Sequence, residues 1–263
     1  MKRLPAPLQK SVIVVGLLAW AATSFYAAQF LLLWLVQLVM IAWESLSLPV
    51  ISVDETLLST LLSGAVYVGS LAIVLYVPYK FFGRGTTRKE MGLEQKWPNI
   101  KDIGLAPLVL FATMVLSALA LLAMTHVFDG FNLLQEQQLP FDVSAQFSYI
   151  QLWLIFATLV LFAPVAEELL FRGYLYGKMR RHTSAFMTIL LTSLLFAALH
   201  LGIGSLAELQ WNVFINTFIL ALGMGLLREY TGSVWAGILV HMLKNVTAYL
   251  LLFIAPGLLG GVL

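Results

Sequence analysis

Two adjacent glutamates, Glu167 and Glu168, interrupt an apolar stretch of this chain, and residues 149–166 before them include no charged side chain. Burial of an ionised carboxylate in a membrane is costly unless a partner compensates it, so such a residue indicates a functional site. Arg172 lies four residues after Glu168, on the same helical face, and is its expected ion partner. Glu167 projects about 100° away from Glu168 and is therefore free for chemistry.

Two histidines and an asparagine in later apolar stretches could work with Glu167. His200 follows Phe196 by one helical turn, and we expect the phenyl ring to pack on the imidazole and fix its rotamer. His241 and Asn245 are four residues apart and share a helical face. Along ideal helices, Glu167 and both histidines lie about 20 to 27 Å from the basic residues at the ends of their helices. These groups could therefore meet inside the membrane.

A desolvated carboxylate can act as a general base near neutral pH. Beside His200, Glu167 could hold and deprotonate a water molecule. His241 and Asn245 could then donate hydrogen bonds to the oxyanion of a tetrahedral intermediate. This chemistry hydrolyses a peptide bond without a covalent intermediate. The predicted catalytic residues are Glu167, Glu168, His200, His241 and Asn245, and the predicted supporting residues are Arg172 and Phe196.

A metal-dependent version of the same site is the alternative. Glu167, His200 and His241 form a suitable three-ligand set for Zn²⁺, with water in the fourth position. The sequence contains no H-E-x-x-H motif, and the ligands would come from three separate helices, so we favour the metal-free version. A third interpretation is purely structural, with the charged residues forming an ion-paired patch that holds helices together.

The composition indicates a membrane protein. Hydrophobic residues make up 60% of the 263 residues and charged residues 11%, and the mean hydropathy is +0.91. A soluble domain carries about 25% charged residues. The absence of cysteine excludes disulfides, thiol nucleophiles and thiolate metal sites. We therefore predict an all-α, polytopic transmembrane helical bundle.

Seven apolar stretches are long enough to span a membrane, although the fifth is short. The first is too long for one straight crossing and should be tilted or broken. The last would give an eighth segment if it divided near residue 248. The predicted spans are 11–43, 57–79, 103–128, 148–177, 185–201, 209–227 and 233–254.

The basic residues predict the orientation. Thirteen of the fifteen lysines and arginines fall on one side of the predicted spans, and Arg172 and Lys244 fall within spans. The loops on the other side, 44–56, 129–147 and 202–208, contain no Lys or Arg. By the positive-inside rule, the N-terminus is cytoplasmic. The expected location is the plasma (inner) membrane.

Two regions are predicted along the chain. Residues 1–147 form a transmembrane scaffold with a cytoplasmic loop at 80–102. Residues 148–263 form the catalytic core, which carries nearly all the polar residues within the spans. The expected partners are membrane lipid and a protein or peptide substrate, with no nucleic acid.

Three motifs resemble those of one protein family. E-E-L-L-F-R at 167–172 looks like the E-E-x-x-x-R motif of the CPBP family, which groups CAAX proteases with bacteriocin-processing enzymes. F-A-A-L-H at 196–200 resembles its F-x-x-x-H motif, and H-M-L-K-N at 241–245 resembles its H-x-x-x-N/D motif. Each motif alone is weak, but three in this order are specific, and the resemblance covers about residues 150–255.

The resemblance implies an intramembrane endopeptidase of the type that trims prenylated CAAX proteins. In such enzymes the first glutamate and the histidine of the second motif activate water, and the last histidine and asparagine stabilise the oxyanion. These roles agree with those inferred above for Glu167, His200, His241 and Asn245. The family is often described as metalloproteases, while a metal-free glutamate mechanism has also been proposed.

The predicted function is therefore hydrolysis of a peptide bond in a membrane-associated protein or peptide precursor. One alternative is a non-enzymatic bacteriocin-immunity or scaffolding protein of the same fold. A proton-coupled transporter that uses Glu167 and His200 as a relay is less favoured, because the sequence shows no internal repeat.

Overall fold

A computed structural model describes residues 5–49, 54–129, 131–133, 147–202 and 209–255. All the regular elements in these residues are helices, and the predicted all-α class is confirmed. Six of the described helices are long and apolar enough to cross a membrane, and a seventh apolar helix is shorter. The chain is an integral membrane protein with a helical bundle of about seven spans.

The first three helices are long and continuous: α1 (Ala6–Ser45), α2 (Glu55–Phe82) and α3 (Ile100–Val127). The side chain of Asp54 accepts a hydrogen bond from the backbone N–H of Leu57 and so starts α2.

A capping box between Asn99 and Asp102 starts α3. The 40 residues of α1 make a helix about 60 Å long, twice the thickness of a bilayer core. The structure shows α1 as one unbroken helix, so the alternative of a broken first span is wrong.

One continuous helix, Tyr149–Met179, carries both glutamates. Two wider π-helical segments interrupt its α-helical geometry, and such segments are frequent at functional sites. Its successive parts are α4 (Tyr149–Phe156), η1 (Ala157–Phe162), α5 (Ala163–Glu168), η2 (Leu169–Leu175) and α6 (Tyr176–Met179).

Three further helices complete the described fold: α7 (Ala185–Leu199), α8 (Trp211–Thr231) and α9 (Trp235–Tyr249). The 15-residue α7 is the short fifth span expected from the sequence. The last helix continues without a break from α9 through η3 (Leu250–Ile254), so it does not divide near residue 248.

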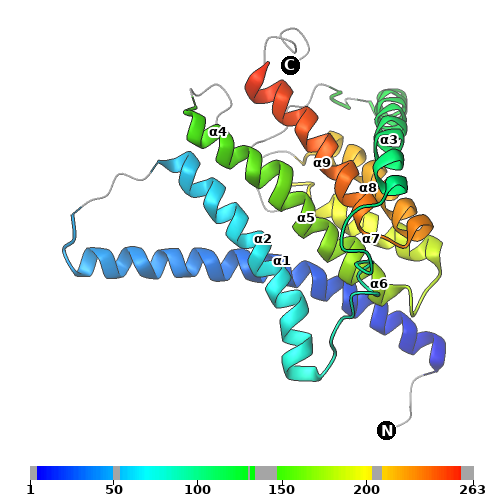
Figure 1. The fold of residues 1–263 in the computed structure, drawn as a ribbon, viewed down its shortest axis with the longest axis horizontal. Helices are drawn as coiled ribbons and strands as arrows, with labels where there is room; N and C mark the ends of the chain where they lie inside the picture. The colour runs from blue at the N-terminus through cyan, green and yellow to red at the C-terminus, as the bar shows by residue number, and fades with distance from the viewer. Residues whose placement is uncertain (1–4, 50–53, 130, 134–146, 203–208, 256–263) are drawn as a thin grey trace.

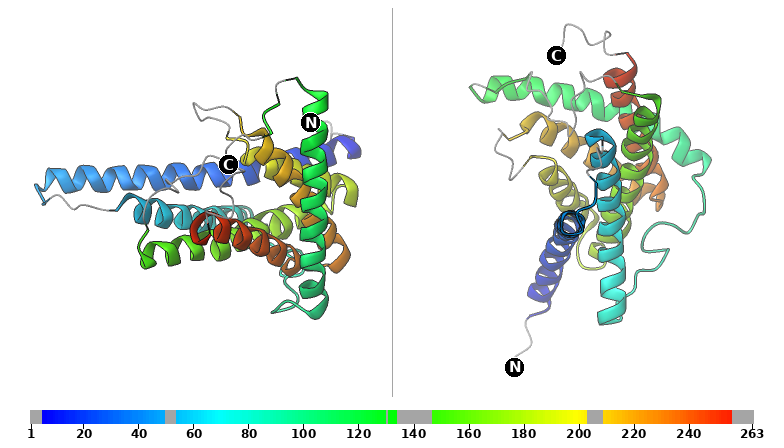
Figure 2. Two further views of the ribbon diagram at one scale, coloured as in Figure 1. Left: turned by 90° about the horizontal axis from the view of Figure 1, so that it is seen from above. Right: turned by 90° about the vertical axis from the view of Figure 1, so that its left-hand side faces the viewer.

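The helix Tyr149–Met179 lies at the centre of the bundle. It packs between α2 and α9, and α1 crosses α2 and extends beyond the other helices (Figure 1). On the far side, α3 packs against α8 and α9 and runs across the direction of the other helices (Figure 2). The central helix therefore reaches neighbours from both halves of the chain.

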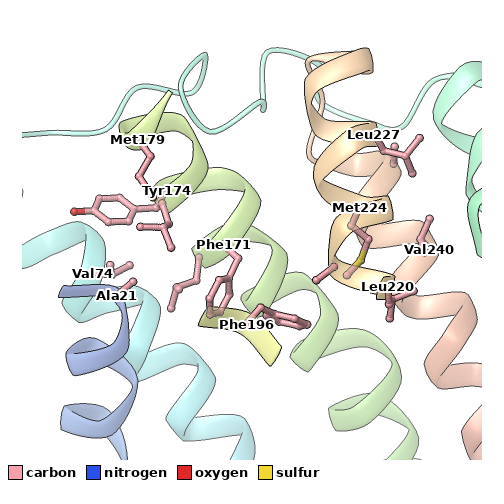
Figure 3. Close-up of a cluster of buried hydrophobic side chains, with 14 of the residues drawn as sticks. Ala21, Val74, Phe171, Tyr174, Met179, Phe196, Leu220, Met224, Leu227 and Val240 are labelled. Atoms are coloured by element: carbon pink, nitrogen blue, oxygen red, sulfur yellow. The ribbon is translucent and has the colours of Figure 1, made fainter. Parts of the chain in front are cut away.

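The main hydrophobic core surrounds this central helix. Tyr174 and Met179 lie beside Val74 of α2, while Met224 of α8 and Val240 of α9 fill the other side (Figure 3). Small residues allow close approach of α8. A Cβ at Gly225 would lie 2.9 Å from Ile189 of α7, and a Cβ at Gly223 would lie 2.7 Å from Thr113 of α3.

Candidate active site

A buried ion pair lies at the centre of the bundle. Arg172 Nη1 donates to Glu168 Oε1 at 2.6 Å, and both side chains are fully buried. The second terminal nitrogen, Nη2, donates to the backbone carbonyl of Ala221 on α8 at 3.0 Å. The guanidinium also lies 4.7 Å from the ring centre of Phe196. Arg172 therefore compensates Glu168 and ties η2 to α7 and α8.

Helix α9 approaches this ion pair closely. Gly237 has no side chain, and a Cβ there would lie only 2.6 Å from Glu168 Oε2. One turn later, His241 Nδ1 lies 3.6 Å from Glu168 Oε1. The glycine thus allows the backbone of α9 to pack on Glu168 and bring His241 beside it.

Glu167 faces the two predicted histidines. Its Oε2 atom lies 4.0 Å from His200 Nε2 and 3.9 Å from His241 Nε2. This oxygen is buried and has no hydrogen-bond partner within the described part of the chain. Polar atoms at such separations are commonly bridged by water. The arrangement therefore leaves an acceptor oxygen and two imidazole nitrogens around a position that one water can occupy.

The tautomer of His200 follows from its second nitrogen. Nδ1 lies 2.8 Å from the backbone carbonyl of Phe196, which can only accept a hydrogen bond. Nδ1 therefore carries the proton, and Nε2 of the neutral ring is an acceptor that faces Glu167. A water between Nε2 and Glu167 Oε2 would meet two acceptors and donate both of its hydrogens.

Phe196 connects the parts of the site. Its ring is buried and lies 4.7 Å from the imidazole of His200 and 5.9 Å from that of His241, centre to centre. It also contacts Phe171 edge-on at 4.8 Å. Since the guanidinium of Arg172 lies over the same ring, Phe196 fixes the positions of three polar side chains.

The predicted residue Asn245 makes a different contact. Its Nδ2 donates at 2.8 Å to the backbone carbonyl of Leu159 in η1. The backbone N–H of Ala163 donates to the carbonyl of Thr158, five residues earlier, as in a π-helix. In the same pattern, the backbone nitrogen of Pro164 would donate to the carbonyl of Leu159. Proline has no N–H. Pro164 thus frees the Leu159 carbonyl, and Asn245 satisfies it from α9.

A small cavity opens beside Glu167. It measures about 190 Å³, and its polar lining groups include Glu167, His200 and the phenol of Tyr67 on α2. The phenol of Tyr67 and the Glu167 carboxylate line this cavity together and interact electrostatically. The cavity is otherwise mainly apolar, with Phe25 of α1 and Leu199 of α7 among its walls.

The structure thus brings together Glu167, Glu168, His200 and His241 with the supporting residues Arg172 and Phe196. Asn245 lies one turn beyond His241 and bonds the central helix. Sequence reasoning missed Tyr67, because a tyrosine in a lipid-facing stretch such as 57–79 is not unusual. Arg228 is one of the thirteen basic residues that the sequence places on the cytoplasmic side, yet it is buried and donates to the carbonyls of Glu90, Arg172 and Gly232.

The predicted zinc ligands do not form a metal site in this arrangement. Two ligand atoms of a tetrahedral zinc lie about 3.3 Å apart. The separations of 4.0 and 3.9 Å from Glu167 to the histidines are larger. Within the described residues, no three His, Cys, Asp or Glu side chains are grouped so that they could hold a metal ion.

The fold and site together define an integral membrane protein with a glutamate–histidine centre inside its helical bundle. Residues 149–247 match a protein-family model described as type II CAAX prenyl endopeptidase Rce1-like. The resemblance to CAAX proteases that was predicted from the sequence is confirmed for this part of the chain. No curated protein and no solved structure matches the chain. The match supports a CAAX-type intramembrane endopeptidase.

Proposed function

We propose that the chain hydrolyses a peptide bond of a membrane-associated protein or peptide precursor, using water activated by Glu167 and His200. The observation that carries the proposal is the Glu167 Oε2 atom. It is buried, has no hydrogen-bond partner among the described residues, and lies about equally far from two imidazole nitrogens beside a cavity. An unpartnered carboxylate oxygen in a membrane protein is costly, so we expect water to occupy this position.

The reaction begins with a water that donates one hydrogen to Glu167 and one to His200. Glu167 accepts a proton as the water oxygen attacks the carbonyl carbon of the substrate. The oxyanion that forms receives hydrogen bonds from His241 and from Asn245, whose amide nitrogen carries a second hydrogen beyond the one donated to Leu159. When the C–N bond breaks, the proton on Glu167 passes to the leaving nitrogen.

Glu168 and Arg172 have a supporting role in this proposal. Their ion pair is neutral overall and fully buried, so it does not compete for the water. It holds the end of α5 and the start of η2 in place, and with them the adjacent Glu167. The proximity of His241 Nδ1 to Glu168 supports an orienting role for this carboxylate.

The location and partners belong to the same proposal. The distribution of Lys and Arg supports a cytoplasmic N-terminus. The proposed location is the plasma (inner) membrane. The substrate is a protein or peptide reached from membrane lipid. The family description supports one test substrate, a peptide that ends in a prenylated C-a-a-X sequence. A secreted peptide precursor or another membrane protein is the other candidate class.

The test replaces Glu167 with Gln, which keeps the size of the side chain and removes the base. Purified protein in proteoliposomes would receive a fluorescence-quenched peptide ending in farnesylated Cys-Val-Ile-Met and the same peptide without the lipid. Membrane proteins and peptides from cells with either form would be compared by mass spectrometry. We expect cleavage to fall about 100-fold or more in Glu167→Gln, because the general base is lost.

The matched control is Glu44→Gln, which removes an exposed carboxylate at the end of α1. It should leave cleavage unchanged. If Glu167→Gln retained full cleavage, or if a cellular phenotype survived without cleavage, a non-catalytic immunity or scaffolding role would replace the proposal. Treatment of the protein with a chelator tests the zinc alternative. Activity in metal-free protein supports the metal-independent mechanism, whereas loss of both one equivalent of bound zinc and the activity supports the metal alternative.

A further inference from the structure

Tyr67 lies outside the family match and outside the predicted catalytic core, yet its phenol reaches Glu167 from α2. The tyrosine and the glutamate line the same cavity, together with His200. The shared cavity wall therefore places a residue of the N-terminal region beside the proposed base.

The ring of Tyr67 is held from the N-terminal side. Phe25 of α1 lies 6.4 Å from it, centre to centre, and lines the same cavity. Ser70, one turn further along α2, donates back to the Tyr67 carbonyl at 2.9 Å and also faces the cavity. The phenol therefore approaches Glu167 from a fixed wall formed by α1 and α2.

Glu167 lies between this wall and the histidines. A glutamate side chain has several rotatable bonds, and a catalytic carboxylate needs a partner that restricts its orientation. Its Oε2 atom, which faces His200 and His241, has no hydrogen-bond partner within the described structure. The phenol of Tyr67 carries an O–H donor in the same cavity, so it is a suitable group to hold the carboxylate while Oε2 remains free for water.

We propose that the phenol O–H of Tyr67 donates to the Glu167 carboxylate, which makes Tyr67 a positioning residue that orients this carboxylate toward His200 and His241. The proposal rests on the function proposed above, since it gives Tyr67 a role in activating the water. It also makes α2 a functional part of the active site, although the sequence predicted only a scaffold there.

Tyr67→Phe tests the proposal by removing one hydroxyl while retaining the ring. Cleavage of the farnesylated and unmodified peptides described above would be measured in proteoliposomes. We expect kcat to fall by about 10-fold, because a hydrogen bond to a charged group is lost. KM and the thermal midpoint should stay near their wild-type values, because the cavity wall is intact. Tyr79→Phe, at an exposed position on the same helix, should match the wild type in all three.

A second measurement does not need a substrate. Dicyclohexylcarbodiimide forms an N-acylurea with protonated carboxyl groups in apolar surroundings, and mass spectrometry locates the modified residue. A carboxylate that loses a donor is less stabilised as the anion and less restrained, so we expect Glu167 to be labelled about threefold faster or more in Tyr67→Phe. Tyr79→Phe should be labelled at the wild-type rate.

The outcomes separate the two proposals. If the wild type cleaves and Tyr67→Phe keeps the wild-type kcat, with or without a higher KM, the positioning role is wrong while the protease proposal stands. Equal labelling rates of Glu167 in Tyr67→Phe and Tyr79→Phe would also overturn the positioning role. If neither the wild type nor Glu167→Gln cleaves either peptide or any cellular protein, the protease proposal fails, and labelling alone decides whether Tyr67 restrains Glu167.

Discussion

The two halves of the molecule satisfy their polar side chains in different ways. In α1 to α3, hydroxyl groups donate mainly to the backbone of their own helix, as Thr60 does to Thr56 and Thr113 does to Val109. From α4 onward, hydroxyl groups such as that of Thr192 do the same, but several charged and amide side chains also reach other helices. Arg172 bonds Ala221 of α8, for example.

Burial differs in the same direction. In an 18-residue apolar window of each helix, 6% of the residues of α1 are buried within the protein, against 50% in the helix Tyr149–Met179. The first half therefore presents most of its surface to lipid, whereas the second half encloses charge. Polar contacts between helices are concentrated in the region that holds the site, and Tyr67 is one of the places where the first half meets it.

Arg172→Ala should destabilise the second half more than any other substitution considered. Removal of the guanidinium leaves Glu168 as an uncompensated buried charge, which typically costs about 3–5 kcal/mol. We expect a much lower yield of folded protein and a lower thermal midpoint, measured by tryptophan fluorescence of detergent-purified protein. Arg84→Ala, in the exposed loop after α2, should have little effect.

A double variant separates charge from packing in the same experiment. Glu168→Gln combined with Arg172→Met removes both charges and should recover part of the lost stability. If Arg172→Ala were as stable as the wild type, the ion pair would not be the centre of the second half.

The sequence predicted this pair because a spacing of four residues places two side chains on one helical face, whatever surrounds them. It also predicted seven apolar spans, since length and hydropathy are local properties of the chain. The contact between Asn245 and Leu159 could not be predicted. It depends on a local change of helical pitch before Pro164 and on the packing of α9 against that point.

Tyr67 and Arg228 were missed for a related reason. Their partners lie far away in the sequence, and neither residue type is unusual where it occurs. Arg228 reads as an inner anchor by its position at the end of a span, yet it is buried and bonds Glu90 O at 2.9 Å. Contacts between distant helices are set by tertiary packing, to which a single sequence gives little access.

Gly237→Ala should lower the stability of the second half by a smaller amount than Arg172→Ala. The new Cβ would lie 2.6 Å from Glu168 Oε2, and that oxygen cannot move freely because Arg172 holds the carboxylate. Overpacking of this kind costs about 1–3 kcal/mol. We expect α9 to shift away from the central helix, with a lower thermal midpoint and weaker cleavage, since His241 moves with it.

The control for this substitution comes from the first half. Gly16→Ala in α1 adds a Cβ with no atom within 4 Å, so stability and cleavage should not fall. Equal behaviour of the two variants would mean that close packing on Glu168 is not required for the site.

The smallest expected effect lies where a loop of the first half joins the second. Glu90 accepts a hydrogen bond from the backbone N–H of Thr87, and its carboxylate lies 3.2 Å from Lys178 and 2.8 Å from Arg181. Burial acts to raise the pKa of Glu90, but the Thr87 N–H and Lys178 outweigh it and hold the pKa below its usual value. The stabilisation is therefore present above about pH 4.5, the usual pKa of glutamate, and is lost as the pH falls through the lower folded-state value.

Glu90→Gln should consequently lower the free energy of unfolding at pH 7 by about 0.5–1 kcal/mol, as expected for an ion pair near the surface. The thermal midpoint should fall slightly. The difference from the wild type should shrink as the pH falls below 4.5. Glu94→Gln, an exposed carboxylate in the same loop, is the control and should match the wild type at each pH. A stability difference between Glu90→Gln and the wild type that stayed constant with pH would show that the packing of Glu90, and not its charge, joins the two halves.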